Sequence, residues 1–176
     1  TNTRHNIGFK IIDAINVHFK LSKQKPKFKG LLTTGNIEEK KIYAIKPLTF
    51  MNNSGTAIKE LIDYFKIDAK DVIVFHDDMD IDFGKVKAKF GGSSAGHNGI
   101  ESIDKFIGKD YSRVRIGIGH PKKKRKVNSH VLDDFKDDEE ERIKEITENI
   151  VKQIPTLIDK KIDLFSSKVN QNLNGI

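Results

Sequence analysis

The sequence predicts a single α/β domain. Its 176 residues and 20.0 kDa fall within the usual size of one domain. Only 36% of the residues are apolar, but Ile, Leu, Val and Phe recur in periodic blocks, which argues against a disordered chain. Segments with the pattern of strands alternate with segments of helical periodicity, and this order is typical of α/β proteins. The sequence contains no internal repeat and no linker that would divide it.

The first segment is predicted to be an amphipathic helix, with His5 at its entrance. Its apolar residues recur at helical spacing: Ile7, Ile11, Ile12, Ile15 and Phe19. A basic loop follows around Pro26. Residues 31–37 and 41–46 are then predicted to form the two strands of a hairpin, and Pro47 ends the second strand.

The next two elements lead to a polar cluster. A helix is predicted over residues 55–65, with Asn53 or Ser54 as its N-cap. Residues 72–75 form a continuous apolar run, as expected for a strand that is covered on both faces. His76, Asp77 and Asp78 follow at once. Because ligand sites gather at the ends of buried strands in α/β sheets, this cluster is a candidate site.

The second half of the chain continues the alternation. Residues 84–90 and 113–118 are predicted as strands, and residues 98–106 as a short helix. A basic loop at residues 121–126 precedes a long helix predicted over residues 137–158. The first turn of that helix is acidic, which suits the helix dipole.

Composition limits the function further. The net charge is +7 and the isoelectric point about 9.4, which favours a polyanionic partner but does not establish one. Cysteine is absent, so a disulfide framework or a zinc–thiolate site is excluded. No apolar run approaches the roughly 20 residues that span a bilayer, and the chain does not open with a signal peptide. We therefore expect a soluble cytoplasmic protein.

Three of the six histidines lie in polar contexts where a side chain would face a cleft: His5, His76 and His97. Metal binding is not expected, because no pair has the HExxH spacing and no cysteine contributes. A carboxylate that holds a histidine fixes its tautomer and makes it a general base. His5 and Asp77 would serve if the fold brings them together. From the residues alone, a capping role for each is the competing interpretation.

Five motifs, each weak alone, occur in one order and spacing: residues 3–8 (TRHNIG), 47–55 (PLTFMNNSG), 76–80 (HDDMD), 96–99 (GHNG) and 113–119 (RVRIGIG). Together they resemble the bacterial-type peptidyl-tRNA hydrolase family. The resemblance covers essentially all of residues 1–176. It implies a single α/β domain with a mixed, mostly parallel sheet flanked by helices. That family opens with a strand and a turn carrying another active-site asparagine, and we expect both to be absent from this chain.

The resemblance also implies roles for individual residues. His5 resembles the catalytic base, and Asp77 the carboxylate that keeps it basic. The expected substrate-binding residues are Phe50, Met51, Asn52, His97 and Asn98. Lys89 and Arg115 match basic positions that contact tRNA phosphate. Both also lie on predicted alternating strands that could present them on one face.

The activity implied is hydrolysis of the ester between a peptide and tRNA, which frees the tRNA for reuse in translation. The expected partner is peptidyl-tRNA, bound through its backbone, and the protein is expected to be a monomer without cofactor or metal. A non-catalytic RNA-binding protein, for splicing or for holding tRNA, is the alternative. Retention of His5, Asp77, Asn52 and Asn98 argues against it, whereas the missing opening segment argues for it. A third hypothesis, a nuclear basic protein, is supported only by residues 121–127, and these are better interpreted as a solvated basic loop.

Overall fold

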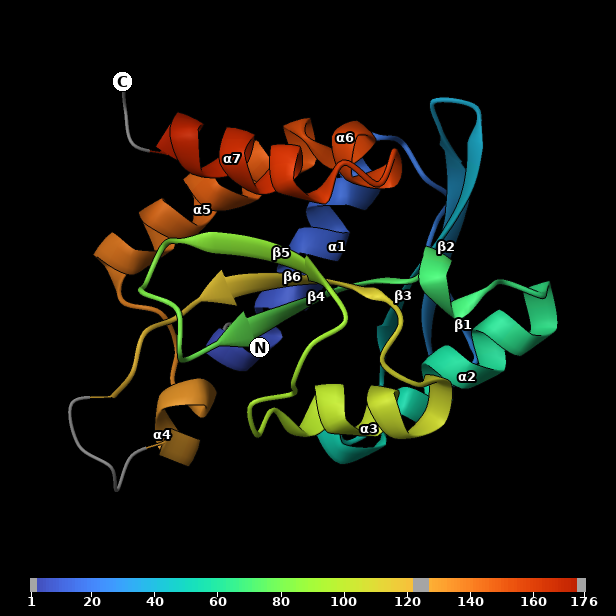
Figure 1. Cartoon of the computed structure of the whole chain (residues 1–176), viewed down its shortest axis with the longest axis horizontal. Coiled ribbons are helices and arrows are strands. Elements are labelled where there is room, and N and C mark those ends of the chain that lie inside the picture. The colour runs from blue at the N-terminus through green and yellow to red at the C-terminus, as the bar shows by residue number, and fades with distance from the viewer. Residues whose placement is uncertain (1–2, 122–126, 174–176) are drawn as a thin grey trace. The chain divides into compact units, whose positions relative to one another are not determined.

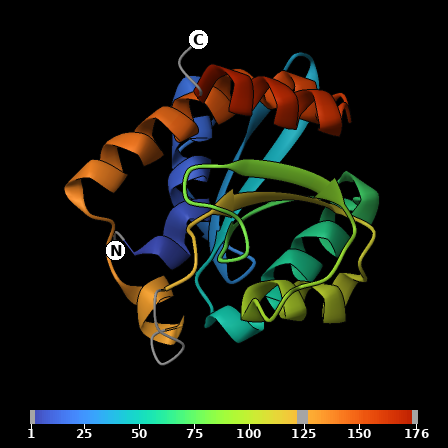
Figure 2. The ribbon, with the colours of Figure 1, turned by 60° about the vertical axis from the view of Figure 1, so that its left-hand side comes forward.

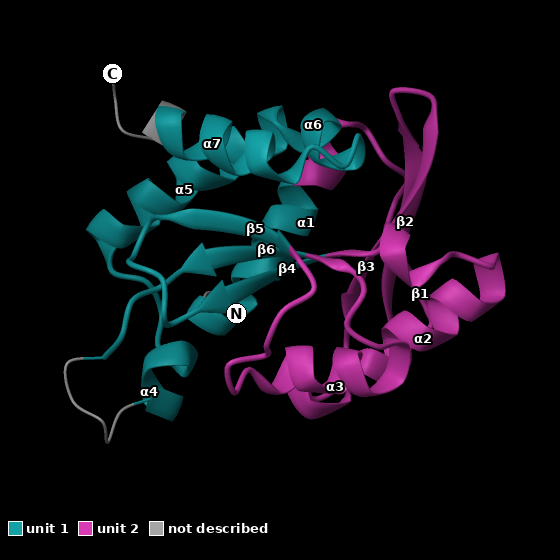
Figure 3. Ribbon diagram, viewed as in Figure 1, with its two compact units in different colours: residues 1–14, 74–89, 113–176 teal, residues 15–73, 90–112 magenta. Residues whose placement is uncertain are grey.

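The computed structural model describes residues 3–121 and 127–173. The chain divides into two compact units, coloured separately in Figure 3. Unit 1 comprises residues 1–14, 74–89 and 113–176, and unit 2 comprises residues 15–73 and 90–112. The division falls within one helix and three strands, so each of these elements contributes residues to both units.

Unit 1 holds most of one sheet and the later helices (Figure 1). In chain order its elements are η1 (Arg4–Asn6), most of α1 (Ile7–His18), β4 (Ile73–Asp78), β5 (Val86–Phe90), β6 (Ser112–Gly117), α4 (Val127–Leu132), α5 (Asp137–Lys152), α6 (Ile154–Ile158) and α7 (Ile162–Leu173). Fully buried side chains come from the helices and the strands alike: Ile7, Ile11, Val86, Val114, Ile116, Ile146, Ile150, Phe165 and Val169. The core of this unit therefore joins sheet and helices.

The sheet of unit 1 has the strand order β4-β6-β5. Ser112 donates to the Val72 carbonyl and Ile118 to the Asp78 carbonyl, so β4 and β6 run parallel. Gly91 donates to the Tyr111 carbonyl and Gly117 to the Lys85 carbonyl, so β5 runs antiparallel to β6. Mixed pairing of this kind is common in α/β proteins.

The outer edge of β5 is covered by α7, which lies alongside it in Figures 1 and 2. The Asn170 amide accepts from the Val86 N–H and donates to the Val86 carbonyl, at 3.0 and 2.7 Å. Ser166 Oγ accepts from the Ala88 N–H at 2.8 Å. These side chains satisfy backbone groups that an edge strand otherwise leaves unpaired.

Unit 2 combines an antiparallel sheet with two packed helices. Its elements are β1 (Lys25–Lys27), β2 (Gly30–Ile37), β3 (Lys40–Pro47), η2 (Met51–Asn53), α2 (Ser54–Phe65), η3 (Ala69–Asp71) and α3 (Asn98–Ile107). The predicted hairpin is confirmed, because β2 and β3 pair from Gly30↔Pro47 to Ile37↔Lys40. α2 and α3 lie side by side in both views (Figures 1 and 2). A Cβ on Gly55 would be 2.3 Å from the Ser102 carbonyl oxygen, so only glycine permits this approach.

The mixed α/β class predicted from the sequence is confirmed, with three details corrected. Among the described strands, β4–β6 is the only parallel pair and the others are antiparallel, so "mostly parallel" was wrong. The helix predicted over residues 137–158 is two helices, α5 and α6. Pro155 lies in the first turn of α6, where its missing N–H is tolerated, and the break falls just before it. Pro26 lies in β1, which pairs along only one edge, rather than in a loop.

Candidate active site

Unit 1 brings His5 and Asp77 together, as predicted. His5 Nδ1 lies 3.0 Å from both carboxylate oxygens of Asp77. The Asp77 side chain is only 3% exposed, and that of His5 is 17% exposed. Because a carboxylate only accepts hydrogen bonds, the proton of the imidazole is held on Nδ1. Nε2 is then the nitrogen that can take up a proton.

The pairing depends on a close approach of α1 to β4. Gly8 lies one turn after His5, and a Cβ at this position would be 2.3 Å from the carbonyl oxygen of Phe75. Phe75 stands two residues before Asp77 on β4. A side chain at position 8 would push the helix away from the strand, so Gly8 allows His5 to reach Asp77. Sequence reasoning placed Gly8 in a motif but did not find this role.

Arg4 anchors the turn that carries His5. Its guanidinium donates to Glu139 Oε2 at 2.9 Å and to the His130 carbonyl at 3.2 Å, and it lies over the ring of Phe135. The Arg4 backbone N–H also donates to the Asp133 carbonyl. Arg4 is buried, so these contacts tie η1 to the start of α5. Arg4 and these partners are at least 126 positions apart in the sequence, so sequence patterns could not predict their contacts.

In unit 2, the predicted residues Phe50, Met51 and Asn52 lie at the entrance to α2. Phe50 is 86% exposed, and Asn52 is also exposed. Leu48, Thr49, Phe50 and Asn53 line a pocket of about 390 Å³. The hollow is open to solvent, so the exposed ring of Phe50 is the feature that offers apolar surface to a ligand here.

The other two predicted residues of unit 2 begin α3. His97 Nδ1 accepts hydrogen bonds from the N–H groups of Gly99 and Ile100, at 3.1 and 3.2 Å, so His97 is the N-cap. Asn98 is the first residue of the helix and is exposed. A Cβ on Gly99 would be 2.6 Å from Met51 Sδ, so η2 and the start of α3 are neighbours. Unit 2 thus gathers its predicted residues at one place.

The two predicted phosphate-binding residues of unit 1 differ in their surroundings. Lys89 is exposed on β5. Arg115 on β6 is 28% exposed, and its Nε donates to Asp78 Oδ2 at 2.8 Å. Because Asp78 neutralises part of the Arg115 charge, Lys89 is the more available cation. Sequence reasoning placed Asp78 in the polar cluster but missed this pair, which joins residues on two different strands.

Comparison with known proteins identifies the family. The sequence matches the peptidyl-tRNA hydrolase family over residues 1–175. The peptidyl-tRNA hydrolase of Pelagibacter ubique is 75% identical over 169 residues, which cover 96% of this chain and 91% of that protein. That of Bartonella henselae is 45% identical over 174 residues, or 99% of this chain and 90% of its own. The chain therefore belongs to the peptidyl-tRNA hydrolase family, as the motifs indicated.

A solved structure supports the same assignment. The crystal structure of peptidyl-tRNA hydrolase from Acinetobacter baumannii superposes with a TM-score of 0.90 at 30% identity. The match covers 96% of this chain and 87% of that chain. In the part of the chain that the structure describes, no helix is both long and apolar enough to cross a membrane. The basic stretch at residues 122–126 lies outside the described residues.

Proposed function

We propose that the chain hydrolyses the ester bond between a peptide and tRNA, with His5 as the general base. One observation carries this assignment: the Nδ1 atom of His5 lies 3.0 Å from both oxygens of the buried Asp77. Membership of the peptidyl-tRNA hydrolase family supports the reaction and its substrate. The mechanism needs no metal or cofactor, and we propose a cytoplasmic monomer.

His5 Nε2 removes a proton from a water molecule as the water oxygen attacks the ester carbonyl carbon. Asp77 stabilises the imidazolium that forms, because the carboxylate lies beside its Nδ1–H. The tetrahedral intermediate then collapses, and the bond to the ribose oxygen breaks. The imidazolium returns its proton to that oxygen, so the products are a free peptide carboxylic acid and tRNA with its hydroxyl restored.

The residues of unit 2 are assigned to substrate binding. Asn52 and Asn98 are exposed amides, which can donate to a carbonyl oxygen and accept from a peptide N–H without adding charge. Phe50 and Met51 offer apolar surface to a peptide side chain. His97 holds the first turn of α3 through its cap, so its role is to position Asn98. Lys89 and Arg115 bind tRNA phosphate, which gives affinity without sequence readout.

Replacing His5 with alanine tests the assignment. His5→Ala should abolish nearly all hydrolysis of an N-blocked aminoacyl-tRNA yet leave tRNA affinity almost unchanged, because the base acts in the chemical step. His18→Ala is the matched control, since His18 is exposed on the same helix. Wild-type turnover by His5→Ala would contradict the mechanism. Binding of tRNA without any turnover by the native protein would favour the RNA-binding alternative.

A further inference from the structure

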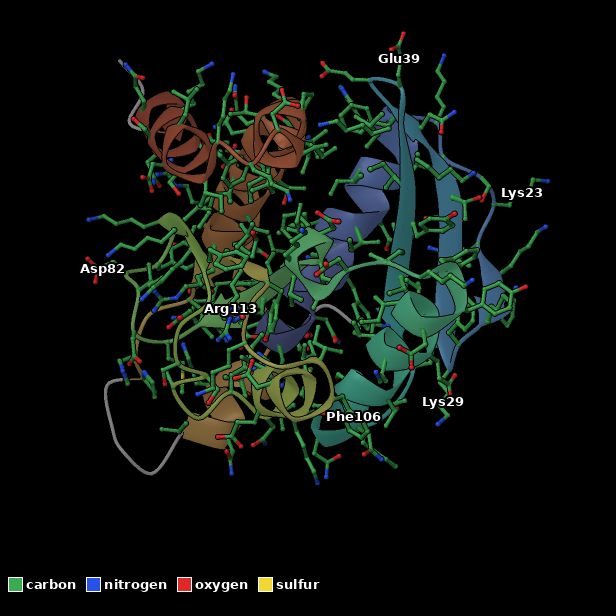
Figure 4. All side chains as sticks on the ribbon, turned by 45° about the vertical axis from the view of Figure 1, so that its right-hand side comes forward. Lys23, Lys29, Glu39, Asp82, Phe106 and Arg113 are labelled. Atoms are coloured by element: carbon green, nitrogen blue, oxygen red, sulfur yellow. The ribbon has the colours of Figure 1, made fainter. Side chains whose placement is uncertain are left out.

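Positive charge is concentrated in one segment of unit 2. Between Phe19 and Pro47 the sequence has eight lysines and two glutamates, an excess of six in a chain whose net charge is +7. This segment contains β1, β2 and β3. Figure 4 shows Lys23 and Lys29 reaching outward from this part of the unit. Such a concentration attracts a polyanion from a distance.

Two of these lysines lie over aromatic rings. The ammonium of Lys27 lies 4.4 Å from the ring centre of Tyr64, 5.0 Å from that of Phe28 and 5.9 Å from that of Phe65. Lys41 lies 5.8 Å from the ring centre of Tyr43. We call this the lysine–aromatic surface, and it comprises Lys25, Lys27, Lys41, Tyr43, Tyr64 and Phe65.

The rings of this surface form one group. Tyr43 on β3 stacks on Phe65 of α2 with 4.0 Å between ring centres, and Tyr64 meets Phe65 edge-on at 4.9 Å. Lys25 and Lys27 are two residues apart on β1, so both point to the same side of that strand. The two lysines are exposed, and Tyr64 is 63% exposed. The surface is therefore open to a partner.

The charge of these lysines depends on whether their neighbours are carboxylates or aromatic rings. A carboxylate would cancel the charge of a lysine, whereas an aromatic ring attracts the ammonium and leaves its charge intact. The nearby acids of α2 are already paired, Glu60 with Lys29 at 3.1 Å and Asp63 with Lys59 at 3.0 Å. Within residues 3–121 and 127–173, neither Lys25, Lys27 nor Lys41 forms an ion pair. Cations that are already positioned lose less entropy when they bind an anion.

We propose that the lysine–aromatic surface binds the phosphate backbone of RNA, as a second contact with the body of the tRNA. The surface suits phosphate because it offers three exposed cations, and two of them, Lys27 and Lys41, lie over aromatic rings. The exposed ring of Tyr64 can in addition stack on a base or lie against a ribose. The inference rests on tRNA as the substrate of the proposed function, and the surface acts in binding, separately from the hydrolysis that His5 performs.

The test compares two triple variants with the same change in charge. Lys25→Gln, Lys27→Gln and Lys41→Gln are combined in the first. The matched control combines Lys144→Gln, Lys152→Gln and Lys161→Gln, three exposed lysines of unit 1. Fluorescence anisotropy with deacylated tRNA gives the affinity of each across a salt series, and urea unfolding confirms that both are folded.

The first variant should lower the slope of log affinity against log salt by about two to three units, since each lost phosphate contact removes about 0.9 on duplex nucleic acid. Its affinity at low salt should fall at least tenfold. The control should keep the slope and affinity of the native protein. Tyr64→Leu keeps every charge and should weaken binding by a smaller factor, because Lys27 loses its principal ring.

Three outcomes would overturn the proposal. One is an unchanged slope in the first variant, and another is an equal loss in the control, which would indicate a general effect of net charge. The third is unchanged tRNA binding with lost binding to phosphatidylserine vesicles, which would assign the surface to an anionic membrane. Hydrolysis of a short N-blocked aminoacyl ester without the tRNA body distinguishes the proposed catalysis by His5 from the proposed RNA binding by the lysine–aromatic surface. This hydrolysis should be unaffected by the first variant and lost in His5→Ala.

Discussion

Replacing Gly8 with alanine should separate His5 from Asp77 and so slow hydrolysis. The new Cβ would lie 2.3 Å from the Phe75 carbonyl oxygen, whereas ordinary contact begins at 3.4 Å, so α1 must withdraw from β4 by about 1 Å. The His5–Asp77 hydrogen bond is 3.0 Å long. An added 1 Å takes it outside the range of hydrogen bonding.

Two opposing terms set the effect of Gly8→Ala on stability. Forcing an extra methyl group into a packed contact costs about 1–3 kcal/mol. Alanine in a helix interior recovers about 0.5–1 kcal/mol relative to glycine. We therefore expect the free energy of unfolding to fall by about 1–2 kcal/mol. The catalytic effect should be larger, because a misplacement of about 1 Å can cost roughly 10²-fold in rate.

Urea unfolding and single-turnover hydrolysis of an N-blocked aminoacyl-tRNA measure these two effects. Val17→Ala is the control, because Val17 lies on the same helix but is 79% exposed. It should change neither quantity appreciably. If Gly8→Ala lost stability but hydrolysed the substrate at the native rate, the close approach of α1 to β4 would not be what positions His5.

Four further variants test other contacts. Asp77→Asn should lower kcat by at least tenfold with little change in KM, because the amide no longer stabilises the imidazolium, and a kcat equal to that of the native protein would contradict this. Lys89→Ala should raise KM for peptidyl-tRNA and reduce the salt slope by about one unit with kcat kept. Arg115→Ala should also lose stability, because it removes the cation beside the buried Asp78 carboxylate. Kinetics across a salt series and urea unfolding distinguish these two. Asn170→Ala should lower the free energy of unfolding by about 1–3 kcal/mol, because it leaves the N–H and the carbonyl of Val86 without their hydrogen-bond partner. A decrease of less than about 0.5 kcal/mol, measured by calorimetry, would refute this.

The sequence predicted elements well where local pattern decides them. The apolar spacing of Ile7, Ile11 and Ile15 defines α1, and the continuous run before His76 defines β4. The break between α5 and α6 was missed because helical periodicity continues through residues 153–155, although Pro155 itself signals a boundary. The short strand β1 was missed for the opposite reason, since a proline and two lysines have low strand propensity and only pairing with β2 makes them a strand.

The candidate site was predicted in part. Motif order named His5 and Asp77, but the distance between them depends on how α1 packs on β4, and no local pattern encodes that packing. The Asp78–Arg115 pair was missed because it joins strands 37 positions apart in the sequence. For the same reason the contacts of Arg4 with residues beyond 129 were not foreseen. Single sequences reveal residue types and spacing, whereas pairings over long separations come from the fold. The prediction of a single domain over residues 1–176 stays a prediction.

The cover that α7 places over the edge of β5 has a consequence for synthesis of the protein. Asn170, which pairs with both backbone groups of Val86, is 84 positions later in the sequence. A ribosome therefore makes β5 well before the side chain that closes its edge, and during that interval the strand can pair with any other extended chain. An unpaired strand edge of this kind is a site at which a nascent chain can aggregate. Chaperones that bind exposed strands would be needed most before residue 170 emerges.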